Sequence, residues 1–263
     1  MSLSNYHTHT ARCHHAEGTD EAYVRAALEA GYSDLGFSDH CPFPYRTGFV
    51  SRIRMLPEAL SGYVHSMQHL ADRYRGQIRL HAGLEAEYFP RYLDYLKSLA
   101  DQGIDYLILG QHFLDSDEDS PYVGNDSMTD DGVLRYAEKV CTAMQTGLYT
   151  YLAHPDLFMR YREENFTHAC EQAADMICQC AMETGTPLEY NVLGLHLQLD
   201  GKACGYPSSA FWHYCTRYPV QTIIGIDAHA PSQLTDLHVR QEAEKRMAAL
   251  SYHPLLSLPL PEK

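Results

Sequence analysis

Short apolar runs alternate with amphipathic stretches along most of the chain, and this alternation predicts its secondary structure. The runs at 106–113 (YLILGQHF) and 221–229 (QTIIGIDAH) are apolar almost up to a polar end, which is typical of strands covered on both faces. The stretches between such runs have apolar residues at helical spacing. Strands that alternate with helices in this way are typical of βαβ units, so the pattern predicts a parallel α/β barrel or barrel-like sheet.

Seven strands and seven main helices are expected from this pattern. The strands are expected within NYHTHT (5–10) and at 34–40, 78–89, 106–113, 150–157, 187–191 and 221–229. The helices are expected at about 19–31, 57–74, 92–99, 131–146, 166–183, 210–216 and 239–250. The segments 41–54, 114–129 and 192–206 are expected to be loops, and a Pro-rich tail follows the last helix. Because no linker or repeat interrupts the series, we expect residues 1–263 to form a single domain.

Composition narrows the class of partner. The formal net charge is −14 and the chain has no Lys/Arg-rich run, so a nucleic-acid partner is not expected. The eight cysteines are scattered, with neither zinc-finger spacing nor the density of a disulfide scaffold. No apolar run reaches about 18 residues and no basic-then-apolar leader opens the chain, so we expect a cytoplasmic protein without a membrane partner. The sixteen histidines suit a metal protein.

Ligand-type residues recur where the predicted strands end. His7 and His9 are one residue apart, which places both imidazoles on the same side of a strand. Six of the seven predicted strands end in His, Asp or Glu, and the carboxyl ends of barrel strands meet at one face. The candidate metal ligands are His7, His9, His15, His40, Glu85, His112, His154, Asp227 and His229.

One metal ion takes about four to six ligands, so nine ligands are too many for a single ion. Nine ligands suit two or three ions. Mixed imidazole and carboxylate donors favour Zn, Fe or Mn over Mg or Ca. Glu85, on a central strand, is the natural carboxylate to bridge two ions. The alternative for any one of these residues is a buried, hydrogen-bonded side chain with a purely structural role.

Taken in order, several motifs resemble the PHP (polymerase and histidinol phosphatase) superfamily, and within it the stand-alone histidinol-phosphate phosphatases. They are HTHTARCHH, GFSDHCPFP, GLEAEYF, GQHFLD, AHPDL, LEYNVLGL, YPS and IGIDAH. The ordered set extends over most of the chain. It is highly specific for the superfamily and less specific for the substrate.

This resemblance implies a distorted seven-stranded (βα)7 TIM-like barrel with two to three divalent metal ions. Carried over by position, the first metal would be bound by His7, His9, Glu85 and Asp227, the second by Glu85, His112 and His154, and the third by His15, His40 and His229. The family's Cys-Pro-His-Gly stretch is Cys13-His14-His15-Ala16 here, so His14 is the alternative to His15.

The implied activity is a metal-dependent phosphomonoesterase that hydrolyses L-histidinol phosphate to L-histidinol and phosphate by way of a metal-bridging hydroxide. Glu85, His154, Asp227 and His229 are the expected catalytic residues. Its partner would be a small-molecule phosphate ester, and the chain would act as a monomer or small homo-oligomer. The alternatives are a PHP phosphoesterase for a nucleotide or another small ester, and a non-catalytic PHP accessory module.

Arg160 lies where the family has a basic residue near the phosphate, and Arg162 is its rival. Arginine can bind phosphate oxygens with two nitrogens at once. Asp39 and Glu87 are candidates to orient ligating imidazoles, although a loop acid and a strand-face acid are the simpler interpretations.

Two further patterns have simpler explanations. The acidic loop with Asp115, Asp117, Glu118 and Asp119 could attract the ammonium group of an amino-alcohol phosphate, although such runs are commonly solvated. His65 and His69 are four residues apart on a predicted helix, but that helix lies away from the strand ends. We therefore expect them to be surface histidines.

Overall fold

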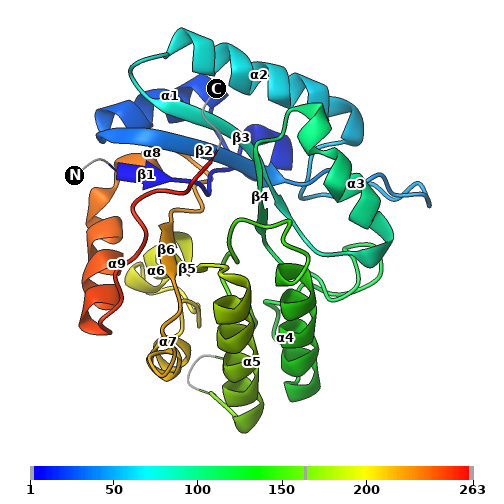
Figure 1. Ribbon diagram of the computed structural model, residues 1–263, viewed down its shortest axis with the longest axis vertical. Helices are drawn as coiled ribbons and strands as arrows, with labels where there is room; N and C mark the ends of the chain where they lie inside the picture. Colours follow the sequence, from blue (N-terminus) through cyan, green and yellow to red (C-terminus); the bar gives the residue numbers. More distant parts are fainter. Residues whose placement is uncertain (1–2, 163–164, 261–263) are drawn as a thin grey trace.

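The computed structural model describes residues 3–162 and 165–260 of the chain. The first two and the last three residues of the expected 1–263 domain therefore lie outside the described residues. It is an α/β fold with a curled parallel sheet (Figure 1). The described residues form six strands: β1 Leu3–Asn5, β2 Tyr32–His40, β3 Arg79–Ala86, β4 Tyr106–Leu109, β5 Leu188–Asn191 and β6 Thr222–Gly225. They form one sheet in the order β1-β2-β3-β4 and a second sheet of β5 and β6, and every strand pair is parallel.

Single bridges connect the two sheets. Leu152 pairs with Leu109, the last residue of β4, on one side and with Leu188 of β5 on the other, and Thr8 pairs with Ala228 beyond β1 and β6. The strand expected at 150–157 is therefore wrong in extent, because only these bridges form there. The backbone of His154 has φ of +31°, a left-handed conformation that ends extended structure two residues after the bridge.

Helices cover the outer side of this sheet (Figure 1). Those that confirm the expected segments are α1 Asp20–Glu29, α2 Leu60–Arg73, α3 Leu93–Ser98, α4 Asp130–Met144, α5 His168–Thr184, α7 Ser209–Cys215 and α9 Leu237–Ala249. Short 3-10 turns occur at η1 Ala11–Cys13, η2 Pro57–Ala59, η3 Pro90–Tyr92, η4 Ala100–Gln102 and η5 Leu157–Met159. The helix ends follow local chemistry: Thr19 and Thr129 cap α1 and α4 with their hydroxyl groups.

Two helices were not expected: α6 Val192–Leu199 and α8 Pro231–Thr235. The expectation of a loop at 192–206 is wrong over α6. Asn191 caps this helix by accepting a hydrogen bond from the Gly194 N–H at 2.9 Å. The glycine suggests a loop, but α6 needs it for packing, since a Cβ atom there would lie 2.5 Å from the carbonyl oxygen of Tyr206.

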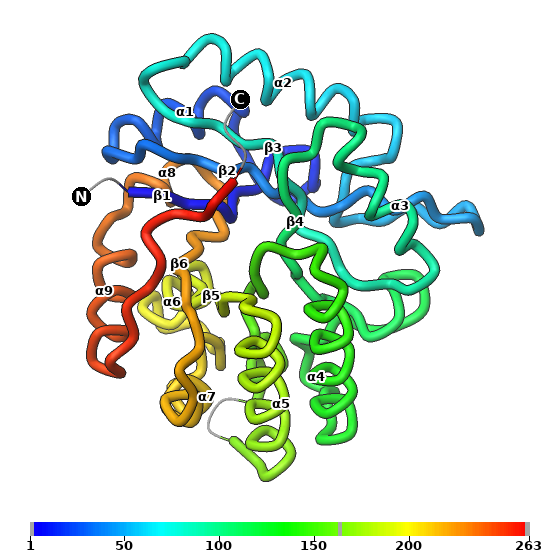
Figure 2. Tube along the Cα trace, viewed as in Figure 1, coloured from blue at the N-terminus to red at the C-terminus, as the bar shows by residue number. Residues whose placement is uncertain are grey.

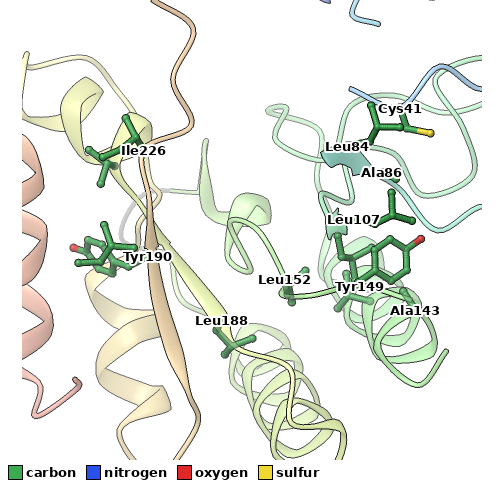
Figure 3. Close-up of a cluster of buried hydrophobic side chains, with 14 of the residues drawn as sticks. Cys41, Leu84, Ala86, Leu107, Ala143, Tyr149, Leu152, Leu188, Tyr190 and Ile226 are labelled. Carbon is green, nitrogen blue, oxygen red and sulfur yellow. The ribbon is translucent and has the colours of Figure 1, made fainter. Parts of the chain in front are cut away.

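The main hydrophobic core lies between the sheet and the helices. Figure 3 shows part of it, with Leu84 and Leu107 from β3 and β4 and Ala143 from α4. Burying a leucine of this kind contributes about 1.5–3 kcal/mol. The core therefore fixes the strands firmly enough for their ends to present side chains in defined positions.

A second, smaller cluster lies among the strands, and the C-terminal tail covers it. Tyr106 at the start of β4 donates a hydrogen bond to the carbonyl oxygen of Tyr6 at 2.8 Å. The tail pairs Leu255 with Ile223 of β6, and the Leu258 N–H donates to the Tyr6 hydroxyl group. Figure 2 shows the tail passing β6 and β1 after α9.

Among the described helices, none has the length and apolar character required to cross a bilayer.

Candidate metal centre

The nine predicted ligands meet at the carboxyl ends of the strands. Seven of them are buried: His7, His9, His40, Glu85, His112, His154 and Asp227. His229 is half-buried and His15 is exposed. Eight of the nine line a single cavity of about 540 Å³, and His7 contacts two of the lining carboxylates.

Glu85, near the end of β3, is the centre of this cluster. Its Oε1 lies 2.9 Å from His154 Nε2, 3.3 Å from His112 Nε2 and 3.6 Å from His7 Nε2. A Cβ atom at Gly110 would come within 1.9 Å of the same oxygen. Glycine at 110 is therefore required for this carboxylate to reach the centre.

The other oxygen of Glu85 faces a different pair of histidines. Oε2 lies 3.0 Å from His40 Nδ1 and 3.5 Å from His9 Nε2. Each oxygen thus faces its own set of imidazoles, which is the arrangement that a bridging carboxylate needs. The sequence prediction of Glu85 as the bridging residue agrees with this geometry.

Asp227 is the second carboxylate of the cluster. Its Oδ1 lies 3.2 Å from His9 Nε2, 3.4 Å from His7 Nε2 and 3.5 Å from His229 Nδ1. Its backbone has φ of +56°, which, as at His154, ends extended structure. In both places a left-handed residue directly follows an extended segment and directs a side chain into the cluster.

A third group of imidazoles surrounds His229. Its ring centroid lies 4.1 Å from that of His9 and 4.8 Å from that of His15, and the His15 ring lies 5.3 Å from His40. His14 is exposed and ends the short turn η1, with its backbone N–H bonded to the Ala11 carbonyl. Of the two alternatives, it is His15 that lines the cavity.

Glu189 on β5 is a buried partner of this cluster that the sequence analysis did not single out. Its Oε1 lies 2.7 Å from His7 Nδ1, and its Oε2 accepts a hydrogen bond from the backbone N–H of His154 at 3.0 Å. Asn191 donates from Nδ2 to Glu189 and to Asp227, at 3.0 and 3.1 Å. Strand alternation places Glu189 on the same face as Asn191, and this was the available indication of its role.

Glu87 and Asp39 support other ligands. Glu87 Oε1 lies 3.1 Å from His112 Nδ1, and the same carboxylate receives hydrogen bonds from the buried Arg54 at 2.9 and 3.0 Å. Burial raises the pKa of Glu87, but Arg54 and His112 together outweigh burial and lower it to about 2. Asp39 is buried on β2, where its Oδ1 lies 3.7 Å from His9 Nδ1. Both acids thus face ligand imidazoles instead of standing on a loop or an exposed strand face.

Burial and charge oppose each other in the protonation of the cluster. Burial disfavours charged His7, yet the carboxylate of Glu189 and its neighbours raise the pKa of His7 well above the usual value. Burial likewise disfavours ionised Glu85, but the surrounding imidazoles, His112 foremost, lower its pKa well below the usual range. Burial lowers the pKa of His229 to about 3. Ionised carboxylates and a neutral imidazole are the forms that bind metals.

The donor set fits bound cations. Glu85, Asp227 and Glu189 are buried together, and their partners in the described chain are imidazoles, one amide and one backbone N–H. Nε2 of His7, Nδ1 of His40 and Oε2 of Glu85 are buried without a hydrogen-bond partner. Buried charges and unpaired ring nitrogens cost free energy unless a counter-ion compensates them. These buried His/Asp/Glu clusters are consistent with metal binding.

Beyond the metal cluster, the cavity wall is apolar and aromatic, with one arginine. The apolar part comes from Ile53, Phe113, Leu193 and Leu197. Arg160 lines the cavity and lies 3.4 Å from the Tyr122 hydroxyl group, with its guanidinium 5.7 Å from the centroid of that ring.

The remaining polar candidates lie elsewhere or have other partners. Arg162 donates to the Met128 carbonyl at 2.8 Å and pairs with Asp130 at the start of α4. His65 and His69 are exposed on α2, which confirms them as surface histidines. The acids of the acidic loop form ion pairs with arginines: Asp115 with Arg135, Asp117 with Arg54, and Glu118 and Asp119 with Arg91.

A curled parallel sheet with a buried histidine and carboxylate cluster at its strand ends is the architecture of a metal-dependent α/β hydrolase. The family model of the PHP domain matches residues 5–192, and the chain belongs to this family. The "Probable histidinol-phosphatase" of Deinococcus radiodurans is 28% identical over 246 residues, with 88% of each chain covered. The histidinol-phosphatase of Bacillus subtilis is 23% identical, over 87% of this chain and 94% of its own.

A solved structure supports the fold assignment. The histidinol phosphate phosphatase of Lactococcus lactis, solved with Zn, L-histidinol and phosphate, has a TM-score of 0.72 at 16% identity. The match covers 97% of this chain and 95% of that one. The resemblance to PHP proteins inferred from the motifs is thereby confirmed.

Proposed function

We propose that this chain is a metal-dependent phosphomonoesterase that hydrolyses L-histidinol phosphate to L-histidinol and phosphate. The observation that supports this best is the convergence of histidines and carboxylates around Glu85 in a cavity large enough for a small ester. The similarity to histidinol-phosphatases over nearly the whole chain supports the same reaction.

The proposed ligand sets are those that the family resemblance implies. His7, His9, Glu85 and Asp227 would hold the first ion, Glu85, His112 and His154 the second, and His15, His40 and His229 the third. Divalent ions such as Zn, Fe or Mn, once bound there, supply positive charge for the phosphate oxygens and make water a better nucleophile near neutral pH.

Arg160 would bind the phosphate from the cavity wall. Its guanidinium has several N–H donors, and the described structure gives one of them a long bond of 3.4 Å to Tyr122. The remaining donors can face two phosphate oxygens, and the ring of Tyr122 beneath restricts the arginine to the cavity. We assign substrate binding to Arg160 and not to Arg162, because the latter is bound to the start of α4.

The wall around Arg160 suits a flat leaving group. The side chains of Phe113, Leu193 and Leu197 line it and exclude water from one side of the cavity. An imidazole ring can stack on an aromatic side chain at such a wall. The acids of the nearby loop are already paired with arginines, so the proposal does not rely on them for the ammonium group.

The test is phosphate release from L-histidinol phosphate, compared with a panel of nucleotide and sugar monophosphates, on protein of known metal content. We expect a strong preference for histidinol phosphate. Glu85→Ala and His154→Ala should each lower kcat/KM by more than about 100-fold, because each removes a central ligand. His69→Ala, which removes an exposed histidine of α2, is the matched control and should leave turnover unchanged.

Two results would contradict the proposal in different ways. Full activity of Glu85→Ala or His154→Ala would exclude the metal cluster as the site of reaction. Bound metals with turnover only of other esters would retain the phosphoesterase chemistry and exclude histidinol phosphate as the substrate.

A further inference from the structure

We propose that Glu189 is a positioning residue that couples two metal sites through a single carboxylate. One oxygen fixes the imidazole of His7, and the other fixes the backbone of His154. The inference rests on the proposed function only in that His7 and His154 are taken as ligands of the first and the second metal ion.

The contacts of Glu189 are short and fully buried. Its side chain is 0% exposed, Oε1 lies 2.7 Å from His7 Nδ1, and Oε2 lies 3.0 Å from the His154 nitrogen. His7 follows β1 and His154 follows the bridge at Leu152, so the carboxylate of β5 joins two otherwise separate strand ends. A shift of Glu189 would therefore move ligands of both sites.

At His7 the carboxylate selects the tautomer. A carboxylate that accepts the Nδ1–H leaves Nε2 as the nitrogen whose lone pair would bind a metal ion. That Nε2 is buried without a hydrogen-bond partner and lies 3.4 Å from Asp227 Oδ1 and 3.6 Å from Glu85 Oε1. Nε2 thus points to where the two carboxylates of the first site converge.

At His154 the carboxylate stabilises an unfavourable backbone conformation. A φ of +31° costs a non-glycine residue of order 1–3 kcal/mol, so it persists only where surrounding contacts enforce it. The N–H of His154 donates to Glu189 Oε2, and its Nε2 lies 2.9 Å from Glu85 Oε1. The bond to Glu189 therefore holds the turn that brings this imidazole to the bridging carboxylate.

Neighbouring residues are adapted to this arrangement. A Cβ atom at Gly225 of β6 would lie 1.8 Å from Glu189 Oε1, so the position must lack a side chain. Asn191 donates both to Glu189 Oε2 and to Asp227 Oδ2, which extends the network to a third ligand.

The substitution Glu189→Gln separates this role from simple packing. An amide has the same shape but only one acceptor oxygen, whereas Glu189 accepts at both oxygens: from His7 Nδ1–H at Oε1, and from the His154 N–H and Asn191 Nδ2 at Oε2. Either the His154 N–H loses its acceptor, or His7 turns to the tautomer with Nε2–H, which cannot bind a metal through that nitrogen.

The experiment measures zinc affinity by competition with a chelator, zinc content per chain, kcat and KM for Glu189→Gln, and the Tm of the metal-free form. We expect zinc affinity to fall about 10–100-fold and the zinc content to drop at two sites together. The metal-free Tm should fall as well, because the buried hydrogen bonds of Glu189 to His7 and His154 are present in that form. Glu183→Gln, at an exposed position of α5, is the matched control and should change neither quantity.

Two outcomes would overturn the proposal: unchanged zinc affinity, or loss of zinc at a single site. Should Glu189→Gln fail to fold, nitrogen NMR of the zinc-loaded wild type decides. The His7 signals, assigned by their absence in His7→Gln, should show Nδ1–H, and Nε2–H would overturn the proposal. These readouts need no substrate, so failure of the wild type to hydrolyse histidinol phosphate would leave them interpretable.

Discussion

Gly110 shows how a residue without a side chain shapes the centre. It follows β4 directly, and the carboxylate of Glu85 occupies the space where a side chain would stand, with Oε1 1.9 Å and Cδ 2.4 Å from an added Cβ. Two packed elements enforce this approach, so the carboxylate and not the backbone would have to move. Because Glu85 faces five imidazoles, the effect of such a movement would spread through the cluster.

Gly110→Ala should therefore lower metal content and reduce kcat/KM by on the order of 100-fold while the fold is retained. Gly62→Ala is the matched control, since an added Cβ on α2 would meet no atom within 4 Å. That helical substitution should leave activity unchanged and stabilise the protein by about 0.5–1 kcal/mol. Metal analysis, phosphate release and urea unfolding measure these effects. Equal metal content and activity in the two variants would contradict the argument.

At the scale of elements, an ion-pair group joins the starts of β2 and β3, in addition to the backbone hydrogen bonds between the two strands. Asp34 pairs in register with Arg79, and its Oδ2 accepts from the Arg79 guanidinium at 2.6 and 3.0 Å. Its Oδ1 lies 2.9 Å from His81 Nε2. Burial raises the pKa of Asp34, but His81 first and Arg79 next outweigh burial and lower it.

A lowered pKa in the folded state means that ionised Asp34 stabilises the fold above its ordinary pKa of 3.8, and that this contribution is lost as pH falls through the folded pKa. Asp34→Asn should therefore lower the free energy of unfolding by about 1–3 kcal/mol at pH 7. The difference from wild type should narrow below about pH 4. Urea unfolding of both metal-free proteins from pH 3 to 8 checks this, and a difference independent of pH would contradict it.

The helix α6 is a second element that contributes to the site. It begins directly after β5, whose Glu189 and Asn191 support the cluster, and its Leu193 and Leu197 form part of the cavity wall. The absence of a side chain at Gly194 lets it approach Tyr206. One short segment thus links the support of the metal ligands to the wall that would face the leaving group.

At the scale of the whole molecule, the fold concentrates negative charge at one end of its sheet. The chain has a formal net charge of −14, and the carboxylates of the cluster are buried among imidazoles. Bringing them together opposes folding unless cations bind. Metal ions would therefore stabilise the structure as well as assist the reaction.

Removal of metal by a chelator should lower the Tm, and zinc should restore it. A metal at 100 times its Kd stabilises by about 2.7 kcal/mol, and each kcal/mol moves the Tm of a protein of this size by about 2–4 °C, so we expect a shift of roughly 5–10 °C. Scanning calorimetry with and without chelator measures it. Glu85→Ala is the comparison and should shift by less, whereas an equal shift would mean that the metal acts outside this cluster.

The sequence by itself determined the alternation of strands and helices, the candidate ligands and the PHP resemblance. These depend on local periodicity and on polar residues at strand ends, which can be recognised within a few positions of the chain. Only the tertiary structure decided that His15 lines the cavity while His14 caps a turn, that α6 is a helix, and that the 150–157 segment forms only bridges.

The tertiary structure also decided the partners: Glu189 with His7, and Arg54 with Glu87 and Asp117. Glu189 and His7 are 182 positions apart in the chain, and no local pattern specifies which acid will reach which imidazole. That choice is made by the packing of strands against one another, which positions side chains from distant segments within hydrogen-bond reach.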